Sequence, residues 1–196
     1  MRATGPRFFD PVAVGNRETD AWAAYYRREW SRFLVAAVAM VRNGFAMGPL
    51  RTLLGAWHVL RANQRWAPIP DNDPEAARAS MRRFYALVAR TGDLDIDPAQ
   101  AARLEVEWWR LHRAHQRQGT VDGRQLQEAL VALYSYVYGA EPSALRDAAR
   151  WRVLAMDVSD RWVAAGCDLN DPLLLEERRS LVASYAALRD VAARAA

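Results

Sequence analysis

At 196 residues, with 52% hydrophobic and 26% charged side chains, the chain is long enough for one domain with a sizeable core and too apolar for a disordered protein. Every basic side chain except histidine is an arginine, which favours a GC-rich, bacterial coding sequence. The first 65 residues hold ten Arg against four acidic residues, an excess of +6 in a chain of net charge +4. That excess is too small to indicate a nucleic-acid surface, so we expect no nucleic-acid partner.

The amino-terminal third predicts two helices. Residues 1–18 contain no apolar run, so we expect an N-terminal extension packed on the bundle rather than a secretion signal. Helices are expected at 19–43 and 49–66. Arginines interrupt the apolar region 33–60, which runs through parts of both helices, and leave uncharged runs of at most nine residues. Nine residues span about 14 Å of helix against the roughly 30 Å of a bilayer core. These residues therefore predict a buried helical hairpin without a transmembrane segment, and a cytoplasmic protein.

The rest of the chain is punctuated by acid-proline pairs. Proline is favoured at the first helical position, and an acidic residue before it can cap the free N–H groups. The pairs are Asp73-Pro74, Asp97-Pro98, Glu141-Pro142 and Asp171-Pro172. With the capping-box spacing at Asp122, they predict helices at 74–90, 98–118, 123–138, 142–165 and 172–194. No segment alternates with period two, so the prediction is an all-α, single-domain bundle of about seven helices.

The stretch LEVEWWRLHRAHQ carries the most unusual side chains. On a helical wheel Glu105 and His112 fall on the apolar side, beside Trp108 and Trp109. Arg152 falls on the apolar side of a later helix. Because a buried charge must be paired, the sequence predicts an ion pair between Glu105 and Arg152.

Three interpretations of this cluster are open. The first is an ordinary core with a buried ion pair. The second is an interhelical pocket, formed by Trp108, Trp109, His112, Arg152 and Glu105, for a small apolar ligand; an apolar carboxylic acid is the preferred class unless Glu105 neutralises Arg152. The third is a metal- or haem-dependent oxidoreductase. However, Glu105 and His112 lie about 10 Å apart along the helix and no Glu-x-x-His motif is present, so we predict no metal ligands and no cofactor, with haem or iron as the alternative.

Helix 49–66 predicts a second surface. We expect its core-facing side to consist of Leu50, Leu53, Trp57 and Leu60. We expect its opposite side to be a cationic stripe of Arg51, His58, Arg61 and Arg65. Such a stripe could bind an anion or an acidic partner.

The sequence leaves catalytic residues and enzymatic activity open. It contains no phosphate-binding loop, nucleophile motif or zinc-cysteine pattern, and the single cysteine, Cys167, cannot form an intramolecular disulfide. We expect a non-catalytic binding role, with either a partner protein or a small apolar ligand in the bundle.

Overall fold

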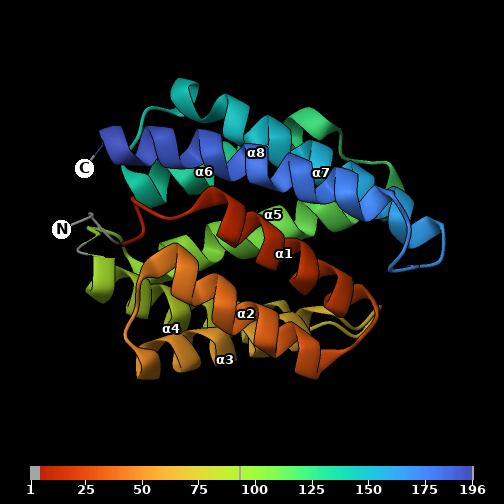
Figure 1. The fold of residues 1–196 in the computed structure, drawn as a ribbon, viewed down its shortest axis with the longest axis horizontal. Helices are drawn as coiled ribbons and strands as arrows, with labels where there is room; N and C mark the ends of the chain where they lie inside the picture. The colour runs from red at the N-terminus through yellow and green to blue at the C-terminus, as the bar shows by residue number, and fades with distance from the viewer. Residues whose placement is uncertain (1–4, 93, 196) are drawn as a thin grey trace.

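The computed structural model describes residues 5–92 and 94–195, and within these ranges the chain is all-helical (Figure 1). Eight α-helices and one 3₁₀ turn make up this described part. They are α1 (Pro11–Tyr26), α2 (Trp30–Phe45), α3 (Pro49–Trp66), α4 (Pro74–Gly92), α5 (Pro98–Gln118), α6 (Gly123–Tyr138), η1 (Pro142–Leu145), α7 (Arg146–Ala164) and α8 (Leu173–Arg194). The all-helical prediction is confirmed, with eight helices in place of about seven.

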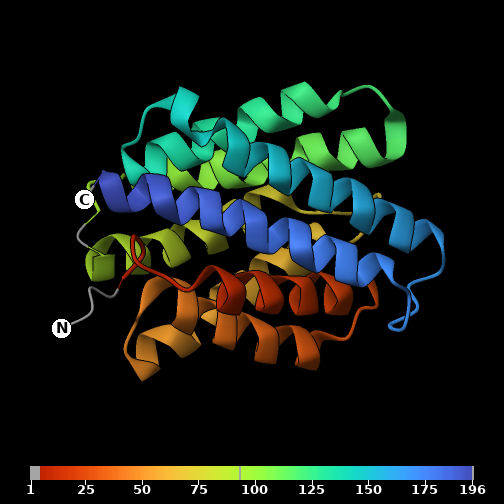
Figure 2. The ribbon, with the colours of Figure 1, turned by 45° about the horizontal axis from the view of Figure 1, so that its top comes forward.

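The helices pack in chain order and close on themselves. Each helix contacts the one before it, and α8 returns to pack against α1. Figure 2 shows α8 lying between α7 and α1. The larger of two hydrophobic clusters in the described part of the chain runs through the interior, so residues from both ends of the chain share one core. None of the described helices is long and apolar enough to cross a membrane.

Aspartate side chains begin several helices, as the acid-proline pairs predict. Asp97 accepts a hydrogen bond from the backbone N–H of Ala99, and Asp122 forms a complete capping box with Gln125. Each of these bonds satisfies an N–H group that the helix itself leaves free. Glu141 makes no such side-chain bond, and the chain after it starts with the short η1 turn before α7.

The predicted helix at 19–43 is wrong, because the chain breaks there into two antiparallel helices. Arg28 has a φ of 60°, in the left-handed region, and this residue separates α1 from α2. The predicted extension is wrong for its second half, since α1 begins at Pro11 and Asp10 caps it. Asp10-Pro11 is a fifth acid-proline pair, and it signals this helix start in the same way as the other four. Residues 1–4 of the predicted extension lie outside the described part of the chain.

The predicted core face of α3 is also wrong. Leu50 is 70% exposed, Leu53 56% and Trp57 49%, whereas only Leu60 of the four predicted residues is buried. The helix instead buries small residues, among them Gly55, where an added Cβ would lie 3.3 Å from a side-chain atom of Val41. The small residues let the backbone of α3 approach its neighbours closely, and Leu50, Leu53 and Trp57 lie on the opposite, exposed side of the helix.

A candidate ligand cavity among the eight helices

A cavity of about 190 Å³ lies inside the bundle, and side chains from all eight helices line it. Most of the lining is aromatic or aliphatic. The polar and charged members of the lining, apart from the tryptophans, are Glu18, Asn63, Tyr85, Glu105, Tyr134, Tyr138, Arg152 and Tyr185. Trp108 and Trp109 line it as well, so four of the five residues predicted for an interhelical pocket meet around this one space.

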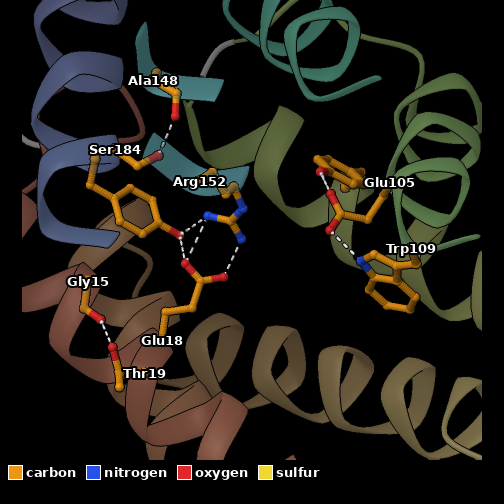
Figure 3. Close-up of polar contacts among 10 residues, drawn as sticks. Gly15, Glu18, Thr19, Glu105, Trp109, Ala148, Arg152 and Ser184 are labelled. Carbon is orange, nitrogen blue, oxygen red and sulfur yellow. Dashed lines mark hydrogen bonds and ion pairs between the residues drawn. The ribbon is translucent and has the colours of Figure 1, made fainter. Parts of the chain in front are cut away.

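Arg152 is held by an acidic residue that the sequence did not indicate. Its guanidinium pairs through two nitrogens with the carboxylate of Glu18 in α1, and Tyr185 donates a further hydrogen bond to Glu18 (Figure 3). Arg152 and Glu18 are 7% and 6% exposed, so the ion pair is buried. The guanidinium carbon also lies 5.4 Å from the ring centre of Trp108 and 5.6 Å from that of Trp22. The carboxylate and the aromatic rings together compensate for the loss of water around the cation.

Two hydrogen-bond donors at the cavity have no partner. The Nε of Arg152 and the hydroxyl of Tyr134 are both buried, and neither has a hydrogen-bond partner of normal geometry among the described residues; the nearby side chain of Ser184 only lowers the pKa of Tyr134. Burial raises the pKa of Tyr134 to about 12, so its hydroxyl keeps its proton at neutral pH. An unpaired buried donor costs free energy, and a molecule with an accepting oxygen would recover it.

Glu105 lies across the cavity with a different set of partners. Its carboxylate accepts a hydrogen bond of 2.7 Å from the hydroxyl of Tyr85 in α4 and one of 3.1 Å from the indole N–H of Trp109 (Figure 3). The predicted ion pair between Glu105 and Arg152 is therefore wrong, because both terminal nitrogens of the guanidinium bind Glu18. Burial without a directly bound cation raises the pKa of Glu105.

His112 lies outside the cavity, in a smaller pocket of about 120 Å³ next to it. The two spaces share Trp22, Trp108 and Trp109 as lining. The imidazole of His112 stacks on Trp108 and lies 3.3 Å from the carboxylate of Asp160. The lining of the smaller pocket includes the exposed side chain of Arg117, so this pocket reaches the surface of the bundle.

The geometry gives no support to a metal or haem site near His112 and Glu105. His112 faces Asp160, and His115 lies 3.0 Å from Asp157, so each imidazole already has a carboxylate partner. Neither histidine lines the cavity. Within the described ranges, no group of three or more His, Cys, Asp or Glu side chains is arranged to hold a metal ion.

Four residues of the lining, Glu18, Tyr85, Tyr134 and Tyr185, were not predicted from the sequence. Glu18 had a signal, since a helix beginning at Pro11 places it on one face with Val14 and Trp22 at helical spacing. The sequence carries no signal that separates the three tyrosines from ordinary core residues. What distinguishes them is the set of hydrogen-bond partners that each hydroxyl finds in the folded chain.

The cationic stripe predicted on α3 divides into two parts. His58, Arg61 and Arg65 line a groove of about 240 Å³ together with Arg83 of α4. Arg51 is not part of that groove and lies 3.5 Å from the hydroxyl of Thr91. Burial and the nearby Arg83 lower the pKa of His58, so the positive charge of the groove comes from arginine.

No protein-family model, curated protein or solved structure matches this chain.

Proposed function

We propose that this chain is a non-catalytic, cytoplasmic binding protein that holds one small, neutral and mostly apolar molecule in the cavity among its eight helices. The observation that carries the proposal is the pair of unpartnered donors, Tyr134 Oη and Arg152 Nε, buried at a space lined mainly by aromatic side chains. The preferred ligand therefore bears an oxygen that accepts hydrogen bonds, as a ketone, ester or ether does.

Electrostatics favours a neutral ligand over a carboxylic acid. Glu18 already neutralises Arg152, and Glu105 has only hydrogen-bond donors as direct partners. A carboxylate ligand would add negative charge beside these two acidic residues. It would also lose its hydration shell without gaining a cation in exchange.

The volume limits the ligand to about one aromatic ring with a short substituent. An apolar protein cavity of about 150 Å³ holds a benzene molecule, and this cavity measures about 190 Å³. A ligand whose aromatic ring packs among the tryptophans and whose carbonyl oxygen accepts hydrogen bonds from Tyr134 and Arg152 would match both the apolar and the polar part of the lining.

Four probes with the same ring test this proposal by isothermal titration calorimetry. Acetophenone supplies a neutral carbonyl, toluene an apolar substituent, benzoate an anion and benzylamine a cation. We expect acetophenone to bind most tightly, and benzoate to bind more weakly than toluene. We expect Tyr134→Phe to weaken acetophenone about tenfold and toluene hardly at all, since a lost hydrogen bond is worth about 1–1.5 kcal/mol.

Tyr136→Phe is the matched control on the same helix. The hydroxyl of Tyr136 contacts the backbone of Asp97 and does not line the cavity, so this variant should bind all four probes normally. Tighter binding of benzoate than of acetophenone would contradict a neutral ligand. Binding of none of the four would contradict the proposed function.

A further inference from the structure

Helix α3 presents a row of large apolar side chains to solvent. Leu50, Leu53, Leu54 and Trp57 are spaced by three and four residues, so they share one helical face, and they are between 43% and 70% exposed. The helix lies along the lower edge of the molecule in Figure 1, away from α8. We call these four residues the apolar stripe. A contiguous row of this kind typically marks an interaction surface, whereas single exposed leucines need no explanation.

All the charged side chains of α3, which carries the apolar stripe, and of the preceding helix α2 are positive. Between Glu29 and Asp71 the chain contains five arginines and no acidic residue. Two of the five, Arg61 and Arg65, line the groove between α3 and α4 together with Arg83, and that groove has no acidic lining in the described part of the chain. Trp57 belongs to both the stripe and the groove, and the Arg61 guanidinium lies 5.9 Å from its ring centre.

We propose that α3 docks this protein on the surface of an anionic phospholipid bilayer. The apolar stripe enters the boundary between headgroups and acyl chains, while Arg61, Arg65 and Arg83 bind lipid phosphates from the adjoining groove. Helices that lie in the membrane interface combine leucine and tryptophan on one side with arginine around them, and anionic headgroups attract the basic residues. This inference concerns the outer surface and is independent of the ligand in the cavity.

The chemistry of the face favours a bilayer over the two macromolecular rivals. Nucleic acid binds through phosphate contacts and base stacking, to which three exposed leucines contribute nothing. An acidic protein partner would need a complementary shape over roughly 800 Å². A bilayer deforms around a single convex helix and supplies both apolar chains and phosphate, which are the two chemistries that the stripe and the groove match.

Co-flotation with vesicles tests the docking of the full chain. We expect binding to vesicles of phosphatidylcholine with 30% phosphatidylglycerol, and at least tenfold weaker binding to phosphatidylcholine alone or in 0.5 M salt. Arg61→Gln/Arg65→Gln should weaken binding at least tenfold through lost charge. Leu53→Ser/Trp57→Ser should weaken it similarly, with the helical circular-dichroism signal of both variants unchanged because the four side chains are not buried.

Leu175→Ser/Arg179→Gln on α8 is the matched control, since Leu175 is 50% exposed and Arg179 is exposed on the opposite part of the bundle. This variant should float with the vesicles as the parent chain does. Three results would overturn the proposal: no flotation of the parent chain, equal loss of flotation in the α8 control, or a sedimentation profile in which the apolar stripe joins two copies of the chain in solution.

Discussion

Glu18, Glu105 and Glu177 are acidic residues inside the bundle, and they differ in how well their carboxylates are paired. Glu18 shares its charge with Arg152 and accepts a bond from Tyr185, and Glu105 accepts hydrogen bonds from two neutral donors. Glu177 has no exposed surface, and neither of its oxygens has a hydrogen-bond partner of normal geometry among the described residues, with the buried hydroxyl of Ser159 as a nearby donor. Because an unpaired buried charge is costly, these three residues should respond very differently to substitution and pH.

Glu18→Gln should lower the free energy of unfolding by about 3–5 kcal/mol, because it leaves the charge of Arg152 buried without a counterion. Urea denaturation measures the change. Asp20→Asn on the same helix is the control: Asp20 pairs with Arg178, and both side chains are about a third exposed, so its loss should cost less than about 1 kcal/mol. Equal costs for the two variants would show that burial does not govern the strength of these pairs.

Burial raises the pKa of Glu177 to about 8 from its ordinary value of 4.5, which makes stability depend on pH. Below pH 4.5 the folded and unfolded chains both carry the proton, and there is no penalty. Between pH 4.5 and 8 the unfolded chain ionises while the folded chain does not, so stability falls as pH rises and then levels off. Glu177→Gln should therefore raise the free energy of unfolding by roughly 2–4 kcal/mol relative to the parent chain at pH 8. At pH 4 the two proteins should differ little in stability.

The neighbouring Glu176 supplies the control for this pH dependence. Its side chain is half exposed and pairs with Arg161, so Glu176→Gln should change stability little at either pH. Thermal melts of the three proteins from pH 4 to pH 9 make the comparison. A parent chain and a Glu177→Gln variant with parallel stability curves would contradict the raised pKa.

At the scale of the helix, glycines allow a close approach at particular contacts between helices. Gly15 in α1 faces α8, where an added Cβ would lie 2.9 Å from the backbone nitrogen of Val182. Gly44 in α2 has more space, since the nearest atom to an added Cβ is a side-chain carbon of Val14 at 3.8 Å. Backbone atoms cannot move aside as a side chain can, so the contact of α1 with α8 depends on Gly15.

Gly15→Ala should destabilise the chain by about 1–3 kcal/mol through overpacking, despite the better helix propensity of alanine. Gly44→Ala should be neutral or stabilising by up to about 1 kcal/mol, since only the helix propensity changes. Denaturant midpoints measured on the two variants separate these effects. Equal stability of both variants would show that α1 and α8 are less closely packed than the structure places them.

The helices that the sequence predicts well are those whose boundaries carry local chemistry. Proline and an acidic residue mark the start of α4, α5 and α8, and their predicted ranges agree with the structure to within two residues. The break between α1 and α2 carries neither Gly nor Pro, so the tertiary packing of two antiparallel helices determines it. The outward face of α3 was likewise unpredictable from periodicity, because the wheel ranks large apolar residues above the small ones that the packing requires.

At the scale of the whole molecule, the cavity results from closing eight helices around rigid aromatic side chains. A helical wheel shows which side chains point inward; four of the five that it grouped, Trp108, Trp109, Glu105 and Arg152, line the cavity, whereas His112 lies in the adjacent pocket. It cannot show which inward groups meet, because partners such as Glu18 and Arg152 lie 134 residues apart in sequence. The unpartnered donors therefore appear only once every helix is in place.

The carbonyl stretching frequency of bound acetophenone, measured by infrared difference spectroscopy with ¹³C-labelled ligand, tests most directly whether those donors serve a ligand. Hydrogen bonds from Tyr134 and Arg152 to the carbonyl oxygen should lower the frequency below its value in a hydrocarbon solvent, and Tyr134→Phe should reverse part of that shift. A bound ligand with the hydrocarbon frequency, or a frequency unchanged by Tyr134→Phe, would contradict the account of this cavity as a site for a neutral oxygen-bearing molecule.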